Sequence, residues 1–379
     1  MDIKQLKKDL IKYSEEIGVQ KIGFTTTDTF DTLKQRLIVQ QSLSFQSGFE
    51  KGSIEERTTP TQLMPKAQSI ISIALAYPSR MKNAPKSRKG ERRGIFARAS
   101  WGKDYHDVLR EKLNLLGEFL QEKLDGAAYK AMVDTGELSD RAVAERAGIG
   151  FVGKNCNLIT EEYGSWVYLG ELITNIPFEP DEPIEEGCGD CNICVDSCPT
   201  GALIEGGQLN AQRCVAYQTL TKNFLPDEFR EKLGNRIYGC DTCQLVCPKN
   251  KGMDYHLHPE MEPDPELAKP KLIPLLKISN REFKENFGNM SGSWRGKKPI
   301  QRNAIVALAH YKDETSIETL EDLMHNDPRP VIRGTAAWAI GKIGRSDACE
   351  MIEEAMSKET DDDVLFEMEK GLDFFKEKV

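Results

Sequence analysis

Eight cysteines, seven of them in two short motifs and Cys214 between the motifs, constrain this chain more than any other feature of its sequence. The first motif, CGDCNICVDSCP (188–199), has the spacing C-x2-C-x2-C-x3-C-P, and the second, CDTCQLVCP (240–248), has the spacing C-x2-C-x3-C-P. Both motifs lie in residues 176–260, which carry seven prolines and little hydrophobic periodicity. A segment so poor in core-forming residues needs cross-links or bound metal to fold, and the cysteines are the available groups.

The spacing of these cysteines predicts two [4Fe–4S] clusters that exchange ligands. In bacterial two-cluster ferredoxins the cysteine before proline binds the cluster of the other motif. Here one ligand of the second motif has moved upstream. A pair of four-cysteine zinc sites is the alternative, but zinc motifs seldom carry two C-x3-C-P endings, so we favour iron–sulfur clusters. The predicted ligands are Cys188, Cys191, Cys194 and Cys247 for the first cluster, and Cys198, Cys214, Cys240 and Cys243 for the second.

The remaining cysteines and the composition indicate a reducing compartment. Ten cysteines without a secretion signal argue for metal or redox chemistry rather than disulfides, so we expect a cytoplasmic protein with no membrane partner. The longest strongly apolar run, IISIALAY (70–77), is too short to span a bilayer and predicts a buried strand. Cys156 and Cys349 receive no role, because free cysteines are usually small buried residues.

The net charge of −9 excludes a uniformly basic nucleic-acid binder, but the charge is unevenly distributed. Residues 80–94 carry seven Lys or Arg and one Glu, and residues 293–302 carry four basic residues and no acid. These segments form either a local anion-binding face, together with arginines of the C-terminal region, or solvated loops.

Periodicity divides the chain into three parts: 1–175, 176–260 and 261–379. The first part alternates helical and strand patterns, with a long helix over 103–124, strands over 127–134 and 164–174, and a helix beginning at Ser139. In the last part, pairs such as Leu320 and Ile352 recur at a spacing of 32 residues, which is typical of an α-solenoid of HEAT-like repeats.

Two further patterns do not predict sites. Gly148, Gly150 and Gly153 form a literal GxGxxG, but a helix precedes it and a strand-like run follows, the reverse of a dinucleotide fingerprint. The five histidines form no metal-binding pair at helical spacing and are interpreted as polar surface residues.

Several segments together resemble the epoxyqueuosine reductase family. They are VDTGELSDRAVAERAGIGFVGKNCNLI (133–159), GSWVYLGELIT (164–174), CGDCNICVDSCPTGAL (188–203) and LGNRIYGCDTCQLVCPKN (233–250), with EERTTPTQLMPKAQSII (55–71) and FARASWGKDYH (96–106) upstream. The resemblance covers nearly the whole chain. It implies an α+β, nitroreductase-like cobalamin-binding catalytic domain (1–175), an embedded ferredoxin-like module with two [4Fe–4S] clusters (176–260), and a linker with an α-helical HEAT-like repeat domain (261–379).

The activity implied by the resemblance is the last step of queuosine synthesis, the reduction of epoxyqueuosine in tRNA to queuosine. Electrons would pass through the two clusters to cobalamin, and Asp134 would donate a proton. A carboxyl does this only if it stays protonated near neutral pH, which burial against the corrin would achieve. From the residues alone, Asp134 is a cap of the DTGEL turn. The implied cobalamin contacts are Arg57, Asp134, Ser139, Arg141, Lys154, Asn157 and Leu158, each of which could instead be structural.

The implied partners are a tRNA anticodon stem-loop carrying epoxyqueuosine and an electron donor such as a flavodoxin or ferredoxin, and we expect a monomer. Two alternatives stay open at this point. One is a cobalamin-dependent reductive dehalogenase acting on a small halogenated substrate. The other is a non-enzymatic electron carrier built from ferredoxin and HEAT elements, which would need no cofactor pocket in residues 1–175.

Overall fold

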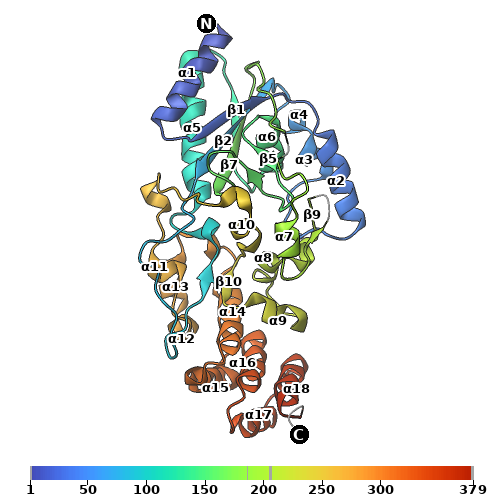
Figure 1. Ribbon diagram of the computed structural model, residues 1–379, viewed down its shortest axis with the longest axis vertical. Helices are drawn as coiled ribbons and strands as arrows, with labels where there is room; N and C mark the ends of the chain where they lie inside the picture. Colours follow the sequence, from blue (N-terminus) through green and yellow to red (C-terminus); the bar gives the residue numbers. More distant parts are fainter. Residues whose placement is uncertain (1, 186, 205–206, 377–379) are drawn as a thin grey trace. The chain divides into compact units, whose positions relative to one another are not determined.

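The computed structural model describes residues 2–185, 187–204 and 207–376 (Figure 1). The chain folds into two compact units, each assembled from three separate segments. Unit 1 comprises Met1–Arg80, Lys103–Cys214 and Asp241–Glu262, and unit 2 comprises Met81–Gly102, Val215–Cys240 and Pro263–Val379. The two units are defined by which residues pack together, whereas the three predicted domains were defined by sequence motifs. The structure therefore does not test the predicted division, which stays a prediction.

Unit 1 is built around a four-stranded antiparallel sheet in the order β1-β2-β7-β4. Its two central strands are eight residues long and pair from Ser69↔Thr174 to Ala76↔Val167. The strands are β1 (Lys21–Thr25), β2 (Ser69–Ala76), β4 (Tyr129–Met132) and β7 (Val167–Thr174), with the short pairs β5 (Phe151–Val152) and β6 (Leu158–Ile159), and β8 (Leu203–Ile204) and β9 (Gln208–Leu209).

The helices of unit 1 cover the sheet and carry the cysteine motifs. Helix α5 packs against β7 and β4, and α6 packs against β7, β2 and β1. The helices are α1 (Ile3–Glu16), α2 (Asp31–Ser42), α3 (Ile54–Thr58), α4 (Pro60–Leu63), α5 (Tyr105–Lys123), α6 (Asp140–Arg146), α7 (Ile193–Asp196) and α10 (Thr242–Leu245), with the 3-10 turns η2 (Ala211–Arg213), η3 (Pro248–Asn250) and η4 (Pro259–Met261).

The alternation of side chains along β7 assigns its two faces. A Cβ placed on Gly170 would lie 3.0 Å from the Leu113 side chain of α5. Since neighbouring residues of a strand point to opposite faces, Glu171 faces the side covered by α6. Apolar side chains of β2, β7 and α6 fill that side, among them Ile70, Ile173 and Val143.

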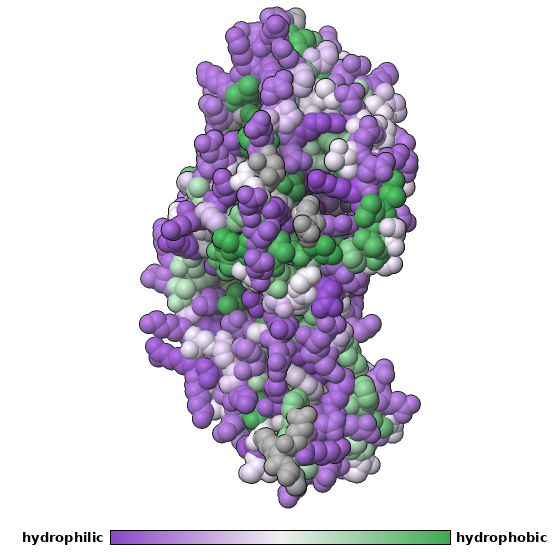
Figure 2. Space-filling model, turned by 45° about the vertical axis from the view of Figure 1, so that its right-hand side comes forward, coloured by the Kyte–Doolittle hydropathy of each residue, from purple (hydrophilic) through white to green (hydrophobic). Residues whose placement is uncertain are grey.

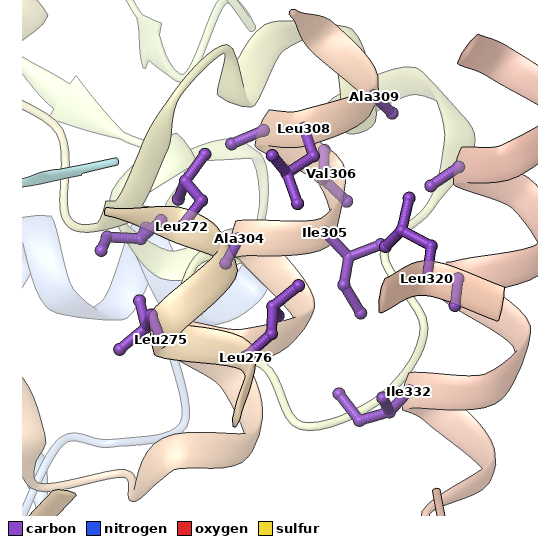
Figure 3. Packing of buried hydrophobic residues seen from close by; sticks show 14 of the residues in the cluster. Leu272, Leu275, Leu276, Ala304, Ile305, Val306, Leu308, Ala309, Leu320 and Ile332 are labelled. Atoms are coloured by element: carbon purple, nitrogen blue, oxygen red, sulfur yellow. The ribbon is translucent and has the colours of Figure 1, made fainter. Parts of the chain in front are cut away.

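Unit 2 is mostly helical, and its core lies between successive helices (Figure 3). Leucines of α12 meet the apolar face of α14, which in turn contacts Leu320 of α15 and Ile332 of α16. Its elements are β3 (Ile95–Phe96), η1 (Arg98–Ser100), α8 (Val215–Gln218), α9 (Asp227–Leu233), β10 (Arg236–Tyr238), α11 (Pro265–Ala268), α12 (Leu272–Lys277), α13 (Asn280–Phe287), η5 (Ser291–Ser293), α14 (Lys297–His310), η6 (Glu314–Ser316), α15 (Ile317–Asn326), α16 (Pro330–Ile343), α17 (Ala348–Met356) and α18 (Asp362–Lys376).

The predicted secondary structure is confirmed in its main elements. The helix predicted over 103–124 is α5, and the strand predicted over 164–174 is β7, which ends at the same residue, Thr174. Ser139 occupies the N-cap position of α6. The 32-residue repeat corresponds to two helix pairs, α14 with α15 and α16 with α17. No helix among the described residues is long and apolar enough to cross a membrane.

Two glycines allow α16 and α18 to approach closely. A Cβ on Gly341 would lie 2.1 Å from the carbonyl oxygen of Gly371, a distance that real Cβ atoms do not adopt. Both glycines have negative φ, so they are required by the contact between the helices and not by their backbone conformation.

Gly341→Ala should therefore destabilise unit 2, even though alanine favours helix more than glycine. The added methyl group must push α18 away, and overpacking of this kind costs about 1–3 kcal/mol. Chemical denaturation would measure the loss, with Glu350→Ala on the exposed face of α17 as the control for adding an alanine to a helix. A Gly341→Ala protein as stable as the parent would contradict the close packing.

Candidate functional site

Asp134 lies in the loop that joins β4 to α6. Its backbone has φ of +45°, a left-handed conformation that few residues other than glycine adopt. The backbone N–H of Asp134 donates to Oδ2 of Asp140, the first residue of α6, at 2.8 Å. The Asp134 side chain is 61% exposed and points toward His106, whose Nε2 lies 3.3 Å from Oδ2 of Asp134.

His106 is held between two carboxylates. Its Nδ1 lies 2.7 Å from Oδ1 of Asp104, which also caps the N-terminus of α5. Burial alone would lower the pKa of His106, but the hydrogen bonds with Asp104 and Asp134 outweigh it and raise this pKa to about 9. The hydrogen bond with His106 lowers the pKa of Asp134. At neutral pH the proton of this pair therefore resides on the histidine.

The expectation for Asp134 concerns the cobalamin-bound protein, so its protonation by burial against the corrin stays a prediction; in the structure described here its carboxyl is exposed and its pKa is lowered. Two expectations for histidines are corrected. His106 was interpreted as a polar surface residue, whereas its side chain is only 20% exposed and contacts Asp134. His258 also departs from that interpretation, because it is 5% exposed and hydrogen-bonded to Gln20.

A column of aromatic rings supports His106. Its ring stacks on Tyr105 with centroids 4.2 Å apart, Tyr105 stacks on Tyr168 at 4.5 Å, and Tyr168 stacks on Tyr77 at 4.3 Å. At the far end, Nε2 of Gln244 lies 3.3 Å from the Tyr77 hydroxyl. Since Gln244 follows Cys243 in α10, the column connects the second cysteine motif to Asp134.

A second pair of carboxyls lies beneath the Asp134 loop. Glu171 is completely buried, and its burial and the neighbouring Asp140 carboxyl raise the pKa of Glu171 well above its usual value. Burial also raises the pKa of Asp140, to about 6, although the N–H of Asp134 favours its ionised form. The site thus combines an ionised His106–Asp134 pair with a second carboxyl pair, Asp140 and the fully buried Glu171.

A cavity of about 720 Å³ opens beside α6. Two predicted cofactor contacts, Ser139 and Arg141, line it, and so does Cys156. Figure 2 shows apolar atoms exposed on this side of the molecule; α2, which lines the cavity, exposes Ile38 and Val39. A lining that mixes apolar side chains such as Phe30 with polar ones such as Arg141 suits a large ligand that carries amide and phosphate groups.

Arg57 lines a separate hollow of about 460 Å³ with Glu50 and residues of α3. Burial lowers the pKa of Arg57, Glu50 acts in the opposite direction, and Arg141 adds to the lowering. The two arginines are therefore close enough to influence each other. Such a pair of cations can be stabilised by an anionic group such as the cobalamin phosphate.

The remaining predicted cofactor contacts lie near the cysteine motifs. Nζ of Lys154 donates to the carbonyl of Gly189 at 2.7 Å, and Nδ2 of Asn157 lies 4.0 Å from Sγ of Cys243. Leu158 is buried with alanines of β2 and α6, so only its backbone could contact a ligand. Asn155, which follows Lys154, is 5% exposed and its Nδ2 has no partner among the described residues, as expected of a group that awaits a ligand.

The predicted ligands of the first cluster lie close together in part. Burial raises the pKa of Cys194, and the neighbouring Cys247 and Cys191 raise it further. Cys247 is thus near Cys194 of the other motif, as the exchange of ligands requires. Cys188 is the first cysteine of the motif, and its Sγ would lie 3.4 Å from a Cβ placed on Gly153.

In the second predicted set, Cys198 is prepared for thiolate chemistry. Burial acts to raise the pKa of Cys198, but hydrogen bonds from backbone N–H groups, including that of Ala202 at 3.3 Å, lower it overall. Thiolates that accept backbone hydrogen bonds suit iron–sulfur ligation. Cys214 and Cys243 also belong to unit 1, while Cys240 is the last residue of its segment of unit 2.

The two unassigned cysteines differ in their surroundings. Sγ of Cys156 donates to the carbonyl of Gly207 at 2.8 Å, and the carbonyl of Cys156 accepts a bond from Arg141. Cys349 is half-buried in α17, with Sγ 3.7 Å from Oε1 of Glu353.

The basic residues of unit 2 are less available than their sequence suggests. Arg302 is completely buried and donates to backbone carbonyls such as those of Gln218 and Asn223. Arg329, Arg333 and Arg345 are paired with Asp327, Glu359 and Asp347. The exposed cations of residues 80–94, by contrast, include Lys82, Lys86, Arg88 and Lys89.

Family models match three parts of the chain. Residues 57–135 match the model described as epoxyqueuosine reductase QueG, DUF1730. Residues 187–250 match the 4Fe-4S double cluster binding domain, and residues 296–373 match HEAT repeats. These matches agree with the predicted fold class and with the predicted pair of clusters.

Relatives extend the similarity over the whole chain. An epoxyqueuosine reductase of Bacillus subtilis (strain 168) is 68% identical and covers 99% of this chain and 97% of its own. The enzyme of the same name from Escherichia coli (strain K12) is 34% identical over 92% of this chain and 93% of its own.

Solved structures agree with these relatives. One epoxyqueuosine reductase, crystallised with a tRNA-Tyr epoxyqueuosine-modified tRNA stem loop, has a TM-score of 0.97 and 68% identity, covering 99% of this chain and 100% of its own. Another, from B. subtilis, has its Asp134 catalytic loop swung out of the active site; it has a TM-score of 0.96 and 68% identity, covering 98% of this chain and 100% of its own. Epoxyqueuosine reductases are cobalamin-dependent oxidoreductases with two [4Fe–4S] clusters, and this chain belongs to their family.

Proposed function

We propose that this chain reduces the epoxide of epoxyqueuosine in tRNA to the alkene of queuosine, with electrons passing through two [4Fe–4S] clusters to cobalamin and Asp134 acting at the proton-transfer step. The balance is one epoxide, two electrons and two protons giving one alkene and one water. Family membership over the full length favours this reaction over dehalogenation and over a carrier without catalytic activity. The electron donor and the monomeric state stay predictions.

The observation that carries the proposal is the contact between His106 of α5 and Asp134 in the loop after β4. The pair holds one proton at neutral pH, because the pKa of His106 is raised to about 9 while that of Asp134 is lowered. When the carbon–oxygen bond of an epoxide opens, the oxygen becomes strongly basic and takes a proton from the nearest donor. Asp134 contacts His106 and its own side chain is exposed, so it can pass that proton on.

The cofactors would be held by residues already described. Ser139 and Arg141 would contact cobalamin in the larger cavity, Arg57 would contact it in the smaller hollow, and Lys154 and Asn157 would contact it near the cysteines. When bound, cobalamin supplies the electrons to the substrate carbon. The crystallised relative with its modified stem loop supports tRNA as the substrate, and the exposed cations of residues 80–94 suit phosphate groups.

The Asp134 loop of this chain should be mobile on the reaction pathway. The relative whose loop is swung out of its active site supports a second loop position here. In the position described, Asp134 has a strained backbone, which costs about 1–3 kcal/mol unless neighbouring contacts compensate.

Replacing Asp134 with asparagine removes the carboxylate that would pass the proton of His106 to the substrate but keeps the shape of the side chain. Turnover of tRNA containing epoxyqueuosine should fall by about 10² to 10⁴, the usual contribution of general acid–base catalysis. Steady-state assays would measure this loss, alongside iron content, cobalamin content and tRNA affinity, which should match the parent. Asp125→Asn, in the exposed loop before β4, is the control. An Asp134→Asn enzyme within a few-fold of the parent would disprove the role.

The pH dependence follows from the raised pKa of His106. A raised histidine pKa means that the proton is held at neutral pH and is lost only as the pH rises through about 9. The kcat/KM of the parent should therefore decrease above pH 9. His106→Gln has no ring to titrate, so it should be slow at all pH values and lack this decrease. If the decrease persists unchanged in His106→Gln, another group is responsible.

Ligand exchange between the clusters can be tested with single cysteine variants. Cys198→Ala should remove the same cluster as Cys240→Ala, because both cysteines are assigned to the second cluster although they lie in different motifs. Iron content should fall by about half in each variant, and their electron paramagnetic resonance spectra should be alike. Cys349→Ala is the control and should keep both clusters. If Cys198→Ala instead matches Cys188→Ala, the ligands are not exchanged.

A further inference from the structure

The buried carboxyl pair beneath the Asp134 loop has no role in the chemistry proposed above. Glu171 lies in the middle of β7, opposite Ser72 of β2 and Met132 of β4. Its side chain is completely buried on the side of the sheet that α6 covers. The surrounding residues of that side are apolar, so a carboxyl group here is unusual.

The charged neighbours of this carboxyl among the described residues are acidic, Asp140 and Asp134. Apart from the facing Asp140, neither Glu171 oxygen finds a hydrogen-bond partner among the described residues, and the hydroxyl of Ser72 has none either. Two carboxylates in contact in a buried site cannot both be ionised, so the pair retains a proton. Since Glu171 is the more deeply buried, it keeps the proton and can donate it in a hydrogen bond to Asp140.

Asp140 also accepts a hydrogen bond from the Asp134 loop. Its Oδ2 accepts the backbone N–H of Asp134 at 2.8 Å. That N–H belongs to a residue with φ of +45°, a conformation that non-glycine residues keep only when neighbouring contacts impose it. The hydrogen bond to Asp140 is such a contact. Because Asp140 also begins α6, it is itself fixed to the sheet by the packing of that helix.

We propose that Glu171 and Asp140 share one proton and together act as positioning residues that hold the backbone of Asp134. Glu171 orients the Asp140 carboxylate, and Asp140 in turn accepts a hydrogen bond from the backbone N–H of Asp134. The proposal rests on the proposed function in assigning a catalytic purpose to the held loop. The hydrogen bonds themselves are independent of that function.

We call the arrangement in which Glu171 and Asp140 hold the backbone of Asp134 the clamp. Amide hydrogen exchange tests the clamp directly, without any substrate. In the purified protein with its clusters, Asp140→Ala should make the amide of Asp134 exchange about 10-fold faster or more, because a charge-assisted hydrogen bond is lost. Asp140→Asn keeps an acceptor oxygen and should remain close to the parent. Asp362→Ala, which also removes the first carboxylate of a helix, is the matched control and should leave this amide unchanged.

Glu171 provides a second test if Asp140→Ala does not fold. Glu171→Gln keeps a donor toward Asp140 and should exchange like the parent. Glu171→Leu has a similar volume but no donor, and it should loosen the Asp134 amide. Parent-like exchange in both Asp140→Ala and Glu171→Leu, or equal exchange in Glu171→Leu and Glu171→Gln, would overturn the proposal.

Turnover separates this proposal from the proposed function. With epoxyqueuosine-containing tRNA, Asp140→Ala should lower kcat by up to about 10²-fold and leave KM nearly unchanged, because a misplaced catalytic group slows the reaction step and not binding. If the parent itself does not turn over this substrate, the proposed function fails while the exchange results still decide the clamp. If the parent is active and Asp140→Ala reacts at the parental rate, the positioning role fails.

Discussion

The antiparallel pairing of β2 with β7 is the interaction on which the rest of unit 1 depends. Eight residue pairs fix its register from Ser69↔Thr174 to Ala76↔Val167. A shift by one residue would exchange the two faces of the sheet, moving Glu171 away from α6. The same register places Tyr168 next to Tyr77, where their rings stack and begin the column that reaches His106. One ladder therefore sets both the carboxyl pair below the loop and the aromatic support beside it.

The acidic groups around this loop differ in their environment, and the difference separates their pKa values. Asp134 and Asp104 contact His106, and both carboxyls have lowered pKa values. Glu171 is buried in a mostly apolar surrounding next to the Asp140 carboxyl, and its pKa is raised. Groups of the same chemical type thus serve as ionised and as neutral partners within one site, a separation that burial and charge produce in many enzymes.

The sequence predicted those features that depend on local spacing. The cysteine motifs, the long helix α5, the strand β7 and the 32-residue repeat each have a period or spacing that can be read directly. It did not predict His106 as a partner of Asp134, because this contact depends on how α5 packs against the end of β4. The only sequence signal was the Asp-x-His triplet at 104–106, which reads equally well as a helix cap.

The clamp residues and the division into units also depend on tertiary structure. Nothing in the sequence shows that Glu171, within an apolar run, faces Asp140, since that requires the register of the sheet. Arg302 looked like a surface cation, but its helix is buried on nearly every side. Segments that belong to one unit are separated by segments of the other, which no local pattern reveals.

The interleaving of the two units has a consequence for synthesis on the ribosome. Strand β3 pairs in parallel with β10, and neither has another partner in its two-stranded sheet. At about 5–20 residues per second, β3 leaves the ribosome many seconds before β10 exists. During that interval Phe96 and its neighbours lack the core that will bury them. The nascent chain therefore carries an exposed apolar segment around Phe96 until β10 has been made, which leaves this region open to chaperone binding during that interval.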